Sequence, residues 1–173
     1  MLRRALDHLY AACAVAAAGF MVLILVIILA QSIGRQMGIV VPSANEIAGF
    51  AFAAVVFLAL APTFRAGGHI RVSLLLQALP PTPRRWIEMV CLAIAIALAL
   101  FLTVYLGRTT LGSIDYGDVS PGLLSIPLWI PQAAMVAGIG VFVIALADAF
   151  VDVLRGVTPP HLIDRPADEP QAD

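Results

Sequence analysis

Long stretches without any charged side chain alternate with short polar segments along the chain. These stretches approach or exceed the roughly 20 apolar residues that a helix needs to cross the hydrocarbon core of a bilayer. Their residues lack the strict alternation of a barrel strand, and a helix satisfies its backbone hydrogen bonds within its own segment. The pattern predicts an all-α membrane protein with four transmembrane helices, at about residues 9–34, 47–64, 89–107 and 121–147.

The first stretch follows Arg3 and Arg4, as the core of a signal peptide would. It is longer than a typical signal-peptide core, and bulky Ile28 stands where a small residue is needed before a cleavage site. We therefore expect this stretch to be a retained membrane span.

The fourth stretch begins within the proline-rich segment "SPGLLSIPLWIPQ". Ser125 could cap a helix there, which would leave Pro127 in the tolerant first turn. Pro131 would then lie deep enough in the helix to kink it.

Composition agrees with a membrane location. Hydrophobic residues make up 61% of the 173 residues and charged residues only 12%, whereas soluble domains carry about 25% charged residues. The net charge of −1 gives no indication of a nucleic-acid partner. We expect one membrane domain over residues 1–157 and a disordered tail over 158–173, where proline and acidic residues are frequent.

The segment "TFRAGGHIRVSLLLQALPPTPRRW", residues 63–86, separates the second and third stretches and holds four of the ten arginines. Within it, residues 69–79 place apolar side chains around a narrow stripe of His69, Ser73 and Gln77. This segment is too short to span, which favours a short amphipathic helix in the membrane interface. An ordinary loop with its leucines packed on the bundle is the alternative.

The arginines are unevenly distributed between the two sides of the predicted spans. With a cytoplasmic N-terminus, eight of the ten lie on the cytoplasmic side, and only Arg35 and Arg108 lie on the other. Because basic residues are enriched in cytoplasmic segments, this distribution predicts that both termini, including the tail, are cytoplasmic.

The predicted spans contain no Asp, Glu, Lys, Arg or His, the residue types that mark ion paths and proton relays within membranes. His8, His69 and His161 fall outside the spans, which argues against haem ligation. No group of His, Cys and carboxylate residues has metal-ligand spacing. We therefore expect no catalytic residue, no metal and no cofactor.

Several polar and aromatic residues near the span ends are candidates for contacts with another subunit or with lipid. The carboxylates at the start of the second and third spans either interact favourably with the helix dipole or form an ion pair with a partner subunit. Tryptophans suit the headgroup level, a glutamine can bond another helix, and the basic residues can bind lipid phosphate. The candidates are Glu46, Arg65, His69, Arg71, Trp86, Glu88, Trp129 and Gln132.

Three stretches carry a family resemblance. They are the acid before the second span in "SANEIAGFAFAAVVFLALA" (43–61), the signature "RAGGHIRVSLL" (65–75), and the proline-rich start of the fourth span in "SPGLLSIPLWIPQAAMVAGI" (120–139). Together with the four predicted spans, they make the chain resemble the small, DctQ-like membrane subunit of tripartite ATP-independent periplasmic (TRAP) transporters.

The resemblance implies a non-catalytic scaffold subunit in the bacterial inner membrane. It would bind and anchor a large, sodium-coupled membrane subunit, while a periplasmic binding protein delivers organic acids, and membrane lipids would surround the spans. The first alternative is a self-sufficient, homo-oligomeric transporter or channel whose pore would be lined by Gln31, Pro131 and Gln132. A membrane enzyme or redox subunit is the second alternative, and the absence of bases and ligands in the spans disfavours it.

Overall fold

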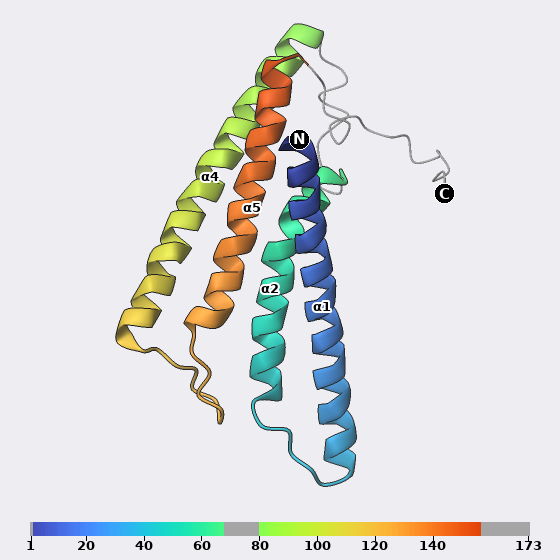
Figure 1. Ribbon diagram of the computed structural model, residues 1–173, viewed down its shortest axis with the longest axis vertical. Helices are drawn as coiled ribbons and strands as arrows, with labels where there is room; N and C mark the ends of the chain where they lie inside the picture. Colours follow the sequence, from blue (N-terminus) through green and yellow to red (C-terminus); the bar gives the residue numbers. More distant parts are fainter. Residues whose placement is uncertain (1, 68–79, 157–173) are drawn as a thin grey trace, which may run out of the picture.

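The computed structural model describes residues 2–67 and 80–156 (Figure 1). The interfacial helix predicted at residues 69–79 and the tail predicted at 158–173 lie outside these residues. His69 and Arg71 lie outside them as well.

Four helices make up most of the described chain: α1 (Leu2–Gln36), α2 (Ala44–Arg65), α4 (Pro81–Tyr116) and α5 (Trp129–Leu154). All four are long and apolar enough to cross a membrane. The predicted all-α membrane fold with four spans is therefore confirmed.

The two longest helices extend well beyond the predicted spans. α1 has 35 residues and α4 has 36, so each is about 50 Å long at a rise of 1.5 Å per residue. The hydrocarbon core is only about 30 Å thick. Charged side chains such as Arg3 and Arg84 occupy the additional turns. A charged residue ends the membrane-crossing part of a helix, but the helix continues because its backbone hydrogen bonds are also stable in the interface and in water.

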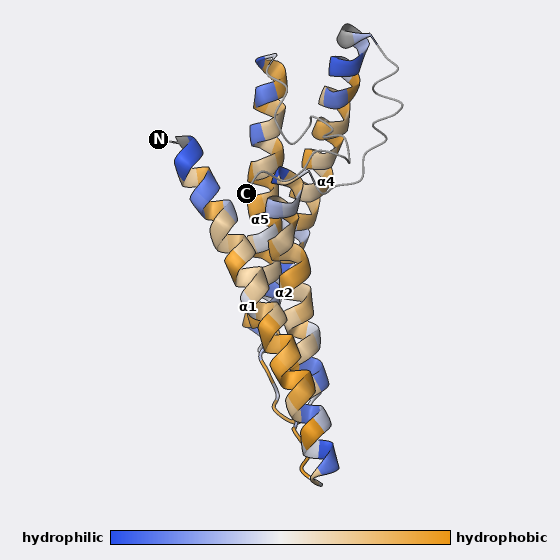
Figure 2. Ribbon diagram, turned by 90° about the vertical axis from the view of Figure 1, so that its right-hand side faces the viewer, coloured by the Kyte–Doolittle hydropathy of each residue, from blue (hydrophilic) through white to orange (hydrophobic). Residues whose placement is uncertain are grey.

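The helices form a single twisted layer in the spatial order α1, α2, α5, α4 (Figure 1). α2 and α5 occupy the middle of the layer and bury more of their surface than α1 and α4, which form its two edges. The N-terminal end of α1 leans away from the other helices in the side view (Figure 2). Each edge helix thus has one packed face and leaves the rest of its apolar surface exposed.

The layer has two chemically different ends. One end, which we call the charged end, contains the start of α1, the end of α2, the start of α4 and the end of α5 (Figure 1). The opposite end, which we call the loop end, contains the connections 37–43 and 117–128. Hydrophilic turns lie near the helix ends, and apolar residues fill the middle (Figure 2).

Small residues allow α2 and α5 to approach closely in the middle of the layer. Ala61, Ala145 and Ala149 are completely buried. A Cβ atom on Gly138 would lie 2.5 Å from the carbonyl carbon of Phe57, so only glycine fits at this point of the α2–α5 contact. The "GIG" at 138–140 therefore marks close helix packing at its first glycine.

The fourth span begins later than predicted. Residues 117–128 form a short turn-back, in which Val119 and Pro127 form an isolated antiparallel bridge and the N–H of Ile126 donates to Ser120 Oγ. Ser125 has a left-handed backbone with φ 44°, and α5 begins at Trp129 without any side-chain cap. The start near residue 121 and the capping role of Ser125 are thus wrong.

This later start also changes the role of Pro131. Because α5 begins at Trp129, Pro131 lies in the first turn, where a helix has no partner for the missing N–H. The predicted kink at Pro131 is therefore wrong, since it required a helix that began several residues earlier.

Candidate subunit interface

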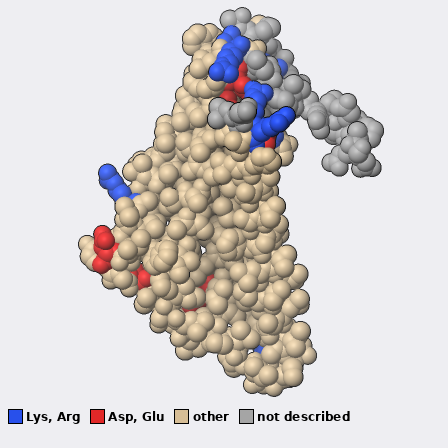
Figure 3. All heavy atoms as spheres, viewed as in Figure 1, with Lys and Arg blue, Asp and Glu red and all other residues tan. Residues whose placement is uncertain are grey.

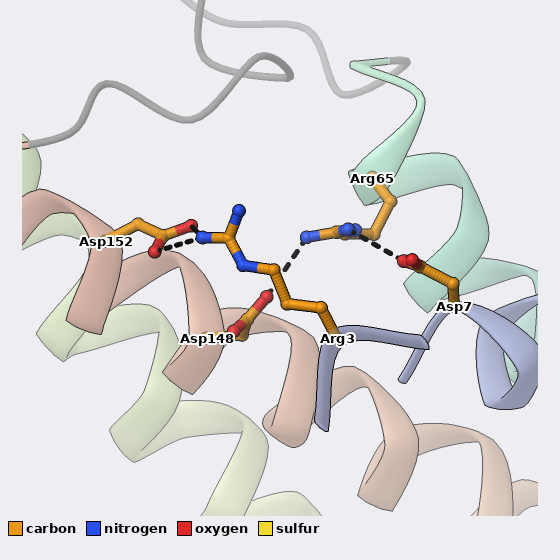
Figure 4. A network of polar contacts seen from close by, with 5 residues as sticks. All are labelled: Arg3, Asp7, Arg65, Asp148 and Asp152. Carbon is orange, nitrogen blue, oxygen red and sulfur yellow. Dashed lines mark hydrogen bonds and ion pairs between the residues drawn. The ribbon is translucent and has the colours of Figure 1, made fainter. Parts of the chain in front are cut away.

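An ion-pair network at the charged end joins three helices (Figure 4). Arg65, the last residue of α2, donates to Asp148 of α5 at 3.0 Å and to Asp7 of α1 at 3.1 Å. Its guanidinium carbon also lies 5.3 Å from the ring centroid of Tyr10, within the range of a cation–π contact. A single arginine therefore holds α1, α2 and α5 in register.

A second ion pair joins α1 directly to α5. One terminal nitrogen of Arg3 donates to both carboxylate oxygens of Asp152, at 2.8 and 3.0 Å. Asp152 is buried, whereas the Arg3 side chain is largely exposed. Since α1 and α5 otherwise share only a small contact, these charged pairs supply much of the connection between them. We call Arg3, Asp7, Arg65, Asp148 and Asp152 the charged network.

Of this network, the sequence predicts only Arg65 as an interface residue. Arg3, Asp7, Asp148 and Asp152 are not among the candidates. One signal was available: Arg3 and Asp7 are spaced by four residues, as are Asp148 and Asp152. Residues at that spacing share one helix face, but the sequence does not say which helices face each other.

At the start of α4, the predicted interface residues Glu88 and Trp86 have different surroundings. Glu88 accepts a hydrogen bond from Arg84 at 3.1 Å, one turn away on the same helix. Trp86 is 64% exposed. It lines a groove of about 580 Å³ between α4 and α5, together with Met89, Phe150 and other residues. Glu88 is thus paired within its own helix, and Trp86 is available for lipid or protein.

Arg85 closes one side of this groove by donating to the carbonyl oxygen of Leu154 at 2.7 Å. That carbonyl belongs to the last residue of α5, and helix-end carbonyls lack an intrahelical donor. The contact therefore joins the start of α4 to the end of α5.

The remaining candidates within the described residues lie at the loop end. Glu46 is in the first turn of α2, while Trp129 and Gln132 are in or beside the first turn of α5. Trp129 is 42% exposed. The Oε1 atom of Gln132 and the Oε2 atom of Glu46 are buried, and no described residue donates a hydrogen bond to either. The structure thus separates the candidates into two groups, with Arg65, Trp86 and Glu88 at the charged end.

Between the two ends, the described spans lack acidic and basic side chains. The described stretches 9–34, 47–64, 89–107 and 129–147 contain no Asp, Glu, Lys, Arg or His. Thr103 and Thr110 donate to the carbonyl oxygens of Ala99 and Leu106, each at 2.8 Å, so these hydroxyls are satisfied within α4. Charged side chains gather near the ends of the layer (Figure 3).

Large apolar side chains cover the outer faces of α1 and α4. Examples are Met21, Leu25, Leu29, Leu98, Phe101 and Tyr105, all of which are exposed. Within a bilayer, such surfaces contact lipid or pack against another protein. Both edges of the layer therefore present apolar surface to lipid or to another protein.

The family model described as the DctQ component of tripartite ATP-independent periplasmic transporters matches residues 24–156. The match includes α2, α4 and α5, and the part of α1 from Ile24 onward. No curated protein and no solved structure matched the chain significantly.

Proposed function

We propose that this chain, which belongs to the DctQ component family of TRAP transporters, acts as a non-catalytic scaffold. In this proposal it binds the large, sodium-coupled membrane subunit and anchors it in the bilayer. The transported compounds are organic acids, which a periplasmic binding protein delivers to the complex.

The observation that carries this proposal is the single-layer arrangement of the four helices. A transport pathway needs walls on several sides and polar groups along it. The layer has α1 and α4 at opposite edges, and its described spans contain no acidic or basic side chain between the ends. A pathway therefore has to be supplied by another chain, and the exposed faces of α1 and α4 provide surface on which that chain can pack.

The contacts within the layer also suit a scaffold. The charged network joins α1, α2 and α5, and the Gly138 contact brings α2 and α5 together. The Arg85 contact adds α4. A support against which a neighbouring domain moves has to resist sliding of its own helices, and these contacts oppose such sliding.

The arginines support a location in the bacterial inner membrane with both termini in the cytoplasm. Among the described residues, the charged end has six arginines and the loop end has two, Arg35 and Arg108. The six are Arg3, Arg4, Arg65, Arg84, Arg85 and Arg155. By the positive-inside rule the charged end faces the cytoplasm, and the loop end faces the periplasm.

Reconstitution tests the scaffold role. We expect sodium-driven uptake of an organic acid into liposomes only when this chain, the large subunit and the binding protein are all present. Liposomes with this chain alone should show no solute flux above the protein-free control. Flux through this chain alone would contradict the proposal and favour the homo-oligomeric transporter. Full uptake without this chain would show that the complex needs no scaffold.

A further inference from the structure

An acidic pocket at the loop end lies apart from the charged network. It has a volume of about 400 Å³ and lies between the 37–43 connection, the start of α2 and the 117–128 turn-back. Polar side chains in its wall include Gln31, Ser43, Asn45 and Glu46. The N–H of Leu124 donates to Ser43 Oγ at 3.2 Å, which ties the two connections together beside the pocket.

The Glu46 carboxylate is the central feature of this pocket. Its Oε2 atom is buried and accepts no hydrogen bond from a described residue. Gly122 packs directly over the carboxylate, and a Cβ atom at position 122 would overlap it. The turn-back therefore closes on Glu46 and shields part of it from water.

A shielded carboxylate oxygen without a donor is unfavourable, because it has lost its hydration and gained no hydrogen bond. Glu46 lies in the first turn of α2, where the positive end of the helix dipole attracts a carboxylate. Neither Arg35 nor Arg108, the described arginines of this end, forms an ion pair with it. The described residues thus leave this charge without a cationic partner.

The surroundings of the pocket are strongly apolar. Val40 and Leu123 are 83% and 81% exposed. Val40 and Leu123 also line the pocket itself. If a partner covers these apolar residues, they exclude water from the charge beside them, which is typical of the energetic centre of a protein–protein interface.

We propose that the acidic pocket receives an arginine or lysine side chain of a partner protein, with the apolar residues around the pocket packing against the surface from which it projects. Charge complementarity selects a basic residue, and a pocket of about 400 Å³ has room for an arginine or lysine side chain. The partner is the large membrane subunit, because the pocket lies at the end of the spans; this part rests on the proposed function.

Photo-cross-linking in membranes that contain the whole transporter tests the proposal. A benzophenone side chain replaces Leu123 at the mouth of the pocket, and the cross-linked peptide is identified by mass spectrometry. We expect a segment of the large subunit that contains an arginine or lysine. Glu46→Gln should lower the cross-link yield about tenfold or more, because it removes one charge of a desolvated pair. Asp115→Asn, which removes an exposed charge at the same end, should leave the yield unchanged.

A charge exchange separates pairing from a local folding defect. Glu46→Arg should abolish the cross-link, and the reciprocal change of the identified basic residue to Glu should restore it. The proposal is overturned by an unchanged yield in Glu46→Gln, by failure of the exchange, or by a cross-link to lipid, a second copy or a segment without a basic residue. Co-purification of the unaltered chain with the large subunit, measured on the same membranes, reports separately on the proposed function.

Discussion

At the residue scale, the structure gives Arg65 a larger role than that of an interfacial charge. Its side chain is 28% exposed and contacts carboxylates from two other helices. Partly buried ion pairs matter mainly when one partner is lost, since the remaining charge stays desolvated. Arg65 is the member of the charged network that pairs with two other helices, so its loss should weaken both contacts.

We expect Arg65→Gln to lower the free energy of unfolding by about 1–3 kcal/mol, because Asp148 loses its charged donor. Thermal unfolding of the purified chain in detergent measures this effect. Arg108→Gln is the matched control, since Arg108 is exposed near the other end of the layer and pairs with no described acid. Equal unfolding temperatures for the two variants would show that the charged network does not stabilise the layer.

At the element scale, the contact between α2 and α5 depends on the absence of a side chain at one position. Gly138 is buried against the backbone of Phe57 and Leu58, whereas Gly140, two residues further along and on another face, has open space around it. Backbone atoms cannot move aside as a flexible side chain can, so an added methyl group at 138 must separate the two helices.

We expect Gly138→Ala to destabilise the chain by about 1–3 kcal/mol, the usual range for overpacking. Gly140→Ala should be neutral or slightly stabilising, because alanine is the better helix former and its methyl group has room. Unfolding of both variants in a denaturing detergent titration makes the comparison. A Gly138→Ala variant as stable as Gly140→Ala would contradict the close α2–α5 contact.

At the scale of the whole molecule, orientation in the membrane decides which partners each end can meet. The acidic pocket and the charged network lie at opposite ends of the layer. If the charged end is cytoplasmic, the acidic pocket is at the periplasmic surface. The distribution of arginines, which predicts the orientation, therefore also predicts the side of the membrane that the proposed docking site faces.

Cysteine labelling measures this orientation. In a background with Cys13→Ala and Cys91→Ala, single substitutions His8→Cys and Asp118→Cys place thiols at exposed positions of the two ends. A membrane-impermeant maleimide added from the periplasmic side should label residue 118 and spare residue 8 until the membrane is disrupted. Labelling of residue 8 alone from that side would show that the orientation is the reverse of the predicted one and that the acidic pocket faces the cytoplasm.

Much of this protein was predictable from the order of its residues alone. The length of an apolar stretch can be read from that stretch alone, and the thickness of the bilayer sets the length that a spanning helix needs. The four spans and the all-α class therefore followed from the sequence. Helix ends were less predictable. Charge marks the limit of the hydrocarbon but does not stop a helix, and the start of α5 at Trp129 depends on the Val119–Pro127 bridge rather than on a local cap.

The tertiary structure decided which distant residues meet. Asp7, Arg65 and Asp148 come together only because α1, α2 and α5 are neighbours at the charged end, and no periodicity along one helix specifies its neighbour. Gly122 lies over Glu46 for the same reason, since the turn-back and the start of α2 are far apart in the chain. The sequence determined which segments cross the membrane, because this depends on the length and composition of each segment by itself. Packing determined the charged network and the acidic pocket, because each needs side chains from several segments at once.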